Sequence, residues 1–280
     1  MAIATLADYL SLRDAPHQRI LGSKTIHTGG STGLVYISYW TQAPGGGSTP
    51  STSAALDNTT TGALFRFVNA SSDALYCVSE SLSTTVAESS SMEAGTFLLM
   101  DRLVHQGGLD ATLTSAQTTN LPTAALPSRA TGGQGVMAFL EVYALIGTTS
   151  TTVTVSYTNQ AGTAGRTSID IGFGANTPGR GAGTLFPISL MDGDTGVRSV
   201  ESVTLAATTG TAGNFGVVLA KPIAMLKAPG PYENKRAMNF LHCGNVWSLP
   251  NNACPWLVHP AANVTYTSGS LQYQLNIARA

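Results

Sequence analysis

The chain has 280 residues, of which only 10% are Asp, Glu, Lys or Arg, whereas soluble globular domains average about 25%. Hydrophobic residues make up 43%, which is enough for a core and unlike a disordered chain, where low hydrophobicity accompanies high charge. The formal net charge of −1, without any run of Lys or Arg, excludes the cation cluster that binds nucleic-acid phosphates. We therefore expect one folded main body with appendages and no direct nucleic-acid partner.

Targeting signals are not evident in the sequence. Met1–Asp14 lacks a basic start and carries Asp8 within its apolar part, which is unlike a secretory signal. The longest apolar run, Val136–Ile146, is broken by Glu141 and is far shorter than the roughly 20 residues that span a bilayer. We expect a protein made in a cytoplasm, with no membrane partner. Its three cysteines cannot all pair with one another and are expected as buried free thiols: Cys77, Cys243 and Cys254.

The first predicted elements are a helix and two strands. Ala4–Asp14 has apolar residues at helical spacing and stops before Pro16. Gly33–Trp40 is aromatic and β-branched, which predicts a strand. The Gly, Pro and Ser of Gln42–Ser53 predict a flexible linker, and the alternation of Ala63–Val68 predicts a second strand with an apolar side.

The middle of the chain predicts a series of strands. Gly95–His105 fits a helix or a buried strand, and we favour the strand. Three further segments, separated by turn residues, predict an antiparallel meander: Val136–Ile146, Val153–Tyr157 and Ser168–Phe173.

A second pair of strands is predicted downstream, in Arg198–Ala206 and Phe215–Ile223. The tetrad Gly162–Gly165 (GTAG) recurs as Gly210–Gly213. Because each tetrad lies between two predicted strands, we expect two similar hairpins and paired sheets.

The amino-acid composition changes after Lys221-Pro222. The following segment, up to Pro260, is rich in Pro, Asn and Trp and has no clear period, which predicts an extended arm. Ser270–Ile277 then alternates apolar and polar residues and predicts a final half-buried strand.

The pattern Gly29-Gly-Ser31-Thr-Gly33 matches the G-x-S-x-G motif of hydrolase nucleophiles. That serine must sit between a strand and a helix, but here a predicted strand follows it. A simple Gly/Ser turn is the better interpretation.

Asp192-Gly-Asp194 resembles the start of a calcium loop. A full loop requires Glu at its twelfth position, where this chain has Val203. We therefore interpret the segment as a turn favoured by Asp and Gly.

Four side chains could in principle bind zinc, but their spacing differs from the usual two to four residues between cysteines: His242, Cys243, Cys254 and His259. The glycine-rich loop Gly172–Gly183 lacks the following helix and the lysine of a phosphate loop. Asp101 and His105 would share a helix face, but nothing in the sequence fixes a catalytic geometry for them. We expect no enzyme activity, no metal and no cofactor.

The composition itself indicates an assembly subunit. Long charged side chains lose up to about 2 kcal/mol of rotamer freedom when they are fixed, whereas Ala and Gly lose none. Interface centres are likewise poor in Lys and Glu. A chain whose faces meet neighbours would have this composition.

The segment Leu98–Pro222 resembles structural proteins of tailed-bacteriophage virions. The similarity lies in phrases such as LLMDRLVHQGG, VTVSYTNQAGTAGRTS and GDTGVRSVESVTLAATTGTAGNFGVVLAKP. The resemblance implies a β-sandwich subunit of a particle, either a head decoration protein or a tail component.

Together these observations predict an all-β fold: an antiparallel, jelly-roll-like β-sandwich with extended N- and C-terminal arms. We expect an arm and linker at 1–58, the sandwich body at 59–226, and a C-terminal arm with a final strand at 227–280. Large aromatic residues concentrate binding energy at interfaces, so Trp247 and Trp256 are the expected anchors to neighbours.

The expected function is that of a capsid decoration or cement protein in a virion. Its expected partners are other copies of itself and a major capsid or tail protein. Three alternatives remain open: a tail or receptor-binding protein, a polysaccharide-acting hydrolase, and a major capsid protein.

Overall fold

The structure is a computed structural model, and it describes residues 5–25, 35–70, 75–86, 95–121, 126–174, 179–228, 235–239, 247–261 and 269–279. In this part of the chain every pairing between strands is antiparallel, and the strands form three sheets. The expectation of an all-β, antiparallel fold is confirmed. One helix, α1 (Leu6–Asp14), and a short 3-10 turn, η2 (Ser128–Ala130), complete the described elements.

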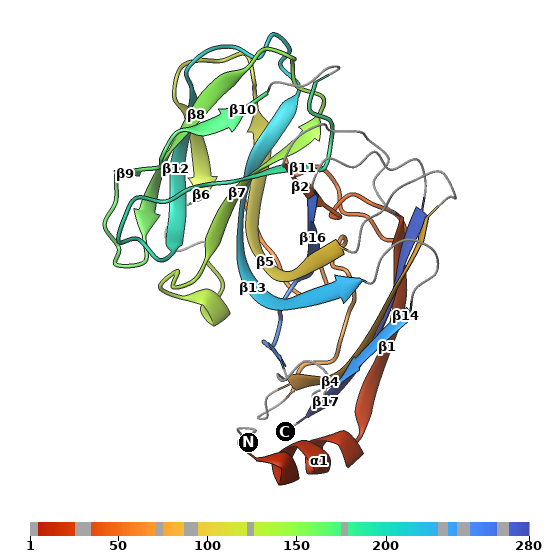
Figure 1. Cartoon of the computed structure of the whole chain (residues 1–280). Coiled ribbons are helices and arrows are strands. Elements are labelled where there is room, and N and C mark those ends of the chain that lie inside the picture. The colour runs from red at the N-terminus through yellow and green to blue at the C-terminus, as the bar shows by residue number, and fades with distance from the viewer. Residues whose placement is uncertain are drawn as a thin grey trace.

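A closed barrel lies at the centre of the molecule (Figure 1). Its described strands are β2 (Val35–Ser38), β5 (Gly95–Leu109), β7 (Met137–Ala144), β11 (Thr184–Pro187), β13 (Asn214–Ala228) and β16 (Pro255–Ala261). They pair in the order β13-β7-β11-β2-β16-β5, and β5 pairs back with β13 to close the ring. The short strand β3 (Ala54–Ala55) also pairs with β5. Closure leaves these strands without a free edge along most of their length.

Side-chain alternation gives the barrel three surfaces. Phe139 and Trp256 point into its interior. Leu140 and Val217 point out on one side, and Phe97 points out on another. Because successive residues of a strand face opposite ways, one set of strands can build an interior and two outer cores.

The upper sheet covers one outer side of the barrel, at the upper left of Figure 1. It consists of β6 (Gln117–Leu121), β8 (Thr151–Asn159), β9 (Arg166–Thr167), β10 (Ile171–Phe173) and β12 (Val197–Leu205). Val153, Val155 and Val203 are fully buried against barrel residues such as Leu140 and Val217. This pair of layers is the expected sandwich.

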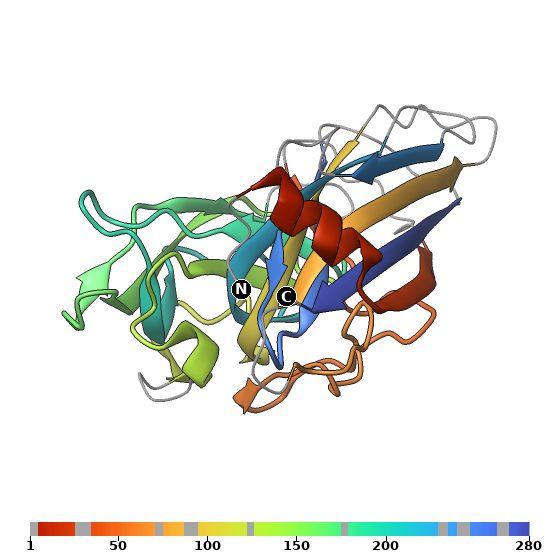
Figure 2. The same cartoon turned by 90° about the horizontal axis from the view of Figure 1, so that it is seen from below.

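The terminal sheet covers the other side. It consists of β1 (His17–Thr25), β4 (Leu75–Val86), β14 (Lys235–Asn239), β15 (Ser248–Leu249) and β17 (Gly269–Arg279). Seen from below, α1 lies beside β17 (Figure 2). Thr5 and Asp8 form a capping box at the start of α1. The helix is where the sequence predicts it, and its buried side chains are Tyr9 and Leu12, whereas Leu6 and Leu10 are exposed.

The expected division at residues 58 and 226 does not follow the sheets. β2 comes from the expected N-terminal arm and β16 from the expected C-terminal arm, yet they pair with each other between β11 and β5. β1 likewise pairs along its whole length with β17. The two terminal regions therefore complete the body, because the barrel wall would be open without them.

The predicted meander is wrong in part. β7 belongs to the barrel, whereas β8 pairs with β9, β10 and β12 in the upper sheet. The GTAG turn at Gly162–Gly165 does join paired strands, β8 and β9. The turn at Gly210–Gly213 joins β12 to β13, which lie in different sheets, so it is not a hairpin.

Two further segments depart from expectation. Ala63–Val68 is not a strand, because its backbone groups bond elsewhere. Leu64 N–H donates to the carbonyl of Pro255, and the Gln18 side chain bonds both the N–H and the carbonyl of Val68.

The expected flexible linker, Gln42–Ser53, is held in place by hydrogen bonds from side chains outside it. The buried Lys24 ammonium donates to the carbonyls of Gln42 at 3.0 Å and Pro44 at 2.9 Å. Trp40 Nε1 donates to the carbonyl of Ser48 at 3.1 Å.

Candidate functional site

A charged cluster lies in the barrel interior. Arg102 Nη2 lies 2.6 Å from Glu141 Oε2 and 3.1 Å from the Tyr143 hydroxyl. The Tyr143 hydroxyl donates to the same carboxylate oxygen at 2.9 Å. Arg102 Nε donates to His105 Nδ1 at 3.2 Å, so the neutral histidine carries its proton on Nε2.

Two tryptophans enclose the Arg102 guanidinium. Its central carbon lies 4.3 Å from the ring centre of Trp40 and 4.8 Å from that of Trp256, within the range of cation–π attraction. The Trp256 indole N–H donates to Ser38 Oγ at 3.0 Å. The His105 ring meets Trp40 edge-on at 5.3 Å. These contacts hold the Arg102 guanidinium in one position in the barrel interior.

Burial determines the protonation states of this cluster. It lowers the pKa of His105 to about 3, with Arg102 acting in the same direction. It also raises the pKa of Tyr143 well above its usual value and that of the nearby Cys254 thiol to about 12. His105 is therefore neutral and Cys254 protonated at neutral pH, so neither is an activated base or nucleophile.

Asp101 and His105 do not form a catalytic pair. Asp101 Oδ2 accepts from Arg129 Nε at 2.7 Å, and Oδ1 accepts from the Cys254 N–H at 2.8 Å. His105 is bonded to Arg102 instead. Both side chains therefore act as internal partners of an arginine.

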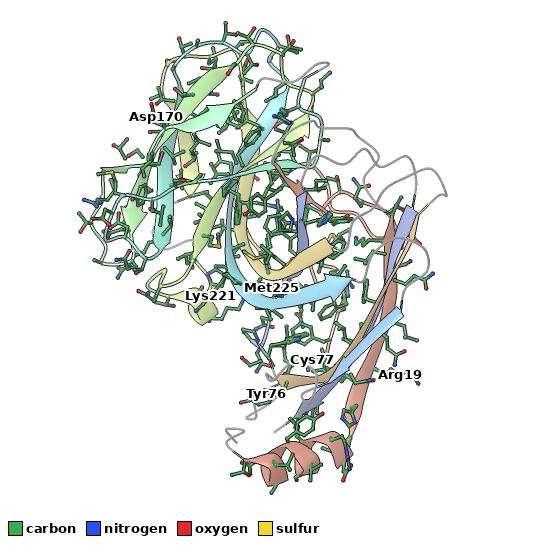
Figure 3. The ribbon with its side chains drawn as sticks, viewed as in Figure 1. Arg19, Tyr76, Cys77, Asp170, Lys221 and Met225 are labelled. Atoms are coloured by element: carbon green, nitrogen blue, oxygen red, sulfur yellow. The ribbon has the colours of Figure 1, made fainter. Side chains whose placement is uncertain are left out.

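A pocket of about 180 Å³ opens beside the ion pair of Asp101 and Arg129. Asp101 and Arg129 line it, together with Lys221 from β13 (Figure 3), two prolines, an isoleucine and Ser248. Asp101 is already occupied by Arg129, so the pocket offers Ser248 no carboxylate or histidine base.

Asp194 joins a loop to the upper sheet. Its carboxylate accepts from the Tyr157 hydroxyl at 2.6 Å, from Asn159 Nδ2 at 2.7 Å and from Arg166 Nε at 2.9 Å. These bonds, the one from Tyr157 first, hold the pKa of Asp194 below its usual value. Asp192 is exposed. The segment is a turn, as predicted. The three donors to Asp194 also attach this turn to the upper sheet, which the sequence does not reveal.

The zinc candidates do not converge. Cys254 faces the barrel interior, whereas His259 is stacked on Phe97 at 4.5 Å on the side of the terminal sheet. His242 and Cys243 lie outside the described residues, as does Ser31. In the part of the chain that the structure describes, no group of three or more His, Cys, Asp or Glu side chains could hold a metal ion.

Trp256 belongs to the core of its own subunit. Its side chain is 1% exposed and meets Phe139 edge-on at 5.9 Å, so it offers no surface to a neighbour. Its expected role as an interface anchor is therefore not retained. Trp247 is partly buried against the core beneath the terminal sheet.

Charge is almost absent from the outside of the upper sheet. Residues 111–128, 142–165 and 202–220 contain no Asp, Glu, Lys or Arg, and they include β6, β8 and the last four residues of β12. β12 itself carries Arg198 and Glu201, which are both partly buried. Nearby, Arg166 is bonded to Asp194, while Asp170 is exposed on this part of the molecule (Figure 3). The outer surface of the upper sheet is therefore poor in charged side chains, and it is the candidate functional surface of this protein.

No helix among the described residues is long and apolar enough to cross a membrane.

No protein-family model matches the chain, and no curated protein matches it. Among solved structures, a chain of T=1 particles derived from infectious bursal virus is similar over 94% of this chain and 78% of its own length, at 13% identity and a TM-score of 0.22. The VP2 subviral particle of infectious bursal disease virus is similar over 94% and 81%, at 11% identity and a TM-score of 0.21. The structure of the Gx strain of that virus is similar over 94% and 82%, at 13% identity and a TM-score of 0.19. A likeness of this size carries no argument about the function of the chain.

Proposed function

We propose that this chain is a structural subunit of a bacteriophage particle, bound to the outside of the head as a decoration protein. One observation carries the proposal: the upper sheet presents an outer face of small, uncharged side chains. Such a face costs little side-chain entropy to bury against a neighbour, and interface centres are depleted of charge in the same way. A monomer that stayed free in solution would gain solubility from charged residues at these positions.

The titratable groups support a structural role over a hydrolase. Glu141, Asp101 and Asp194 are each paired with an arginine. His105 is enclosed in the barrel interior with its Nδ1 already bonded. A glycosidase would need two carboxyl groups facing a substrate, and these carboxylates face internal partners.

The charge balance supports a position on the outer surface of a particle over a position against its genome. Lys and Arg together number 14 against 15 Asp and Glu, and the sequence contains no basic run. A shell protein facing packaged nucleic acid would gain from clustered cations. A tail component shares this charge argument and stays the second candidate.

The test is co-sedimentation of purified chain with purified particles, followed by electron microscopy of the particles. We expect the chain to sediment with particles and its density to follow the symmetry of the head lattice. Density confined to the tail would favour the second candidate. A chain that never co-purifies with particles would refute the assembly role altogether.

A further inference from the structure

The pocket beside the Asp101–Arg129 ion pair contains a cation that has no partner among the described residues. Lys221 lies opposite Asp101 in the pairing of β13 with β5, and both residues line the pocket. Lys221 is exposed, and no described residue forms an ion pair or a hydrogen bond with its ammonium. Figure 3 shows this lysine on β13. Its positive charge is therefore available at the pocket.

Asp101 does not neutralise Lys221, because both oxygens of its carboxylate are already bonded. Oδ2 accepts from Arg129 Nε at 2.7 Å, and Oδ1 accepts from Arg129 Nη2 at 3.0 Å and from the Cys254 N–H at 2.8 Å. The Asp101 and Arg129 side chains are only 4% and 10% exposed. A two-bond contact between arginine and carboxylate is the strong and directional form of an ion pair. Arg129 therefore retains the carboxylate.

Arg129 and Ser248 place further donors at the same pocket. Arg129 uses Nε and Nη2 for Asp101 and for the carbonyl of Leu56. An arginine carries donors on all three nitrogens, and Nη1 bonds no described residue. The exposed Ser248 hydroxyl likewise has no bond within the described part of the chain. The pocket thus offers an ammonium, a guanidinium nitrogen and a hydroxyl, whereas the one carboxylate in its lining is occupied.

Charge and size select the class of ligand. Arg129 and Lys221 supply two positive charges against the one negative charge of Asp101, so a single carboxylate would balance the pocket. A phosphate monoester carries about −1.5 to −2 charges at pH 7 and would leave excess negative charge beside Asp101. Two prolines and an isoleucine form the apolar part of the lining. At about 180 Å³ the pocket is smaller than the roughly 300–1,000 Å³ typical of larger ligands, which suits a short acid.

We propose that this pocket binds the carboxylate of a short aliphatic acid, with Lys221 as the main contact and with Arg129 Nη1 and Ser248 as further donors. The acid is either a free small molecule or the side chain of an acidic residue in another protein, since both present the same group. Arg129 differs from a mobile surface cation because Asp101 already holds its guanidinium in place, which reduces the entropy lost on binding. The proposal does not depend on the decoration role.

The experiment measures the binding of sodium butyrate to the full chain by NMR titration, with butyramide as the matched neutral ligand. Butyramide has nearly the same size and shape but no charge, so we expect it to bind about tenfold more weakly than butyrate, as for the loss of a charge-assisted hydrogen bond. Inorganic phosphate is titrated as the competing anion and should not displace butyrate at equal concentration.

Three variants of the full chain locate the site. Lys221→Met keeps an apolar stem but removes the ammonium, and we expect it to weaken butyrate binding by about tenfold. Ser248→Trp fills the pocket without changing its charge and should abolish binding. The matched control is Arg19→Met, which removes an exposed cation of β1 outside the pocket lining (Figure 3) and should bind butyrate like wild type. Circular dichroism checks folding, and Lys221→Gln provides the second test if Ser248→Trp does not fold.

Several outcomes would overturn the proposal. These are the absence of butyrate binding by wild type, equal binding by wild type and Lys221→Met, and binding of butyramide as tight as that of butyrate. Tighter binding of phosphate would assign the pocket to another class of anion. The source of the carboxylate is tested with N-acetyl-glutamate methylamide, which mimics an acidic side chain in a protein. Tighter binding of this compound than of butyrate supports a protein ligand, and the reverse order supports a free acid.

Discussion

At the scale of single residues, the Arg102–Glu141 pair is the most sensitive point of the barrel. Both side chains are almost completely buried, at 0% and 1% exposed. Arg102→Met would leave Glu141 as a buried charge without a counterion. We expect a loss of about 3–5 kcal/mol in the free energy of unfolding, measured by urea denaturation.

The triple variant Arg102→Met, Glu141→Leu, Tyr143→Phe provides the control for that prediction. It removes both charges and the hydroxyl together, and apolar replacement of a buried ion pair is often neutral. We expect it to regain most of the lost stability. A triple variant as unstable as Arg102→Met would contradict the electrostatic explanation and point to packing instead.

The buried histidines predict a loss of stability in acid. Burial lowers the pKa of His105 to about 3 and that of His259 to about 4, below the unfolded value of about 6.5. Between these values the unfolded chain binds more protons than the folded chain. Stability is therefore complete above about pH 6.5 and falls as the pH decreases, by about 1.4 kcal/mol per pH unit for each histidine.

Urea denaturation at pH 7.0, 6.0 and 5.0 checks this acid dependence. His105→Gln keeps an acceptor for Arg102 but does not titrate, so it should remove about half of the slope. The prediction fails if wild type and His105→Gln show the same slope, because His105 would then be protonated alike in the folded and unfolded chain.

The sequence reveals residue roles unevenly. Val153, Val155 and Tyr157 alternate in a strand, so their burial follows from the pattern alone. The role of Asp194 does not, because its donors come from Tyr157 and Asn159, far upstream in the chain. The link of Arg102 to Glu141 likewise depends on the pairing of β5 and β7 with β13, which is a property of the fold.

At the scale of elements, β16 is a structural strand and not part of an arm. Trp256 on β16 is buried against Phe139 and covers one face of Arg102. We expect Trp256→Ala to cost about 3–5 kcal/mol of unfolding free energy, as for other buried aromatic residues. Trp247→Ala, at a partly buried position, should cost clearly less. If both variants lost little unfolding free energy and by equal amounts, the result would contradict this prediction and favour both tryptophans as interface anchors.

Element types are predictable where a pattern is long. β5, β7, β8, β12 and β17 fall on the predicted strands. Alternation is typical of a strand with one buried face and predicts β8 and β17 well, whereas the apolar runs of β5 and β7 show no such period. The segment Ala63–Val68 shows the limit. Its alternation is real, but its backbone bonds go to Pro255, Gln18 and Asn58, which are contacts that a local pattern does not contain.

At the scale of the whole molecule, the fold depends on contacts between distant parts of the chain. β2 and β16 are far apart in sequence but pair directly in the barrel wall. Composition shifts along the chain predict arms because the terminal segments lack a core of their own. In the structure those segments pair with strands of the same chain. Local composition cannot distinguish a partner within the chain from a neighbouring subunit.

The barrel therefore predicts that residues 59–226 do not fold alone. This fragment retains β5, β7, β11 and most of β13 but lacks β2 and β16, so the interior around Phe139 and Arg102 would open to water. Glu141 and Arg102 would keep each other, yet Trp40 and Trp256 would no longer cover the guanidinium. We expect the expressed fragment to be aggregated or to bind a hydrophobic dye, with no cooperative unfolding transition. Co-expression of 59–226 with 1–58 and 227–280 as separate chains should restore part of the soluble fold, because the missing strands can pair in trans. A soluble 59–226 fragment that unfolds cooperatively by itself would show that the central region is an independent domain, and the barrel would then have to close without its terminal strands.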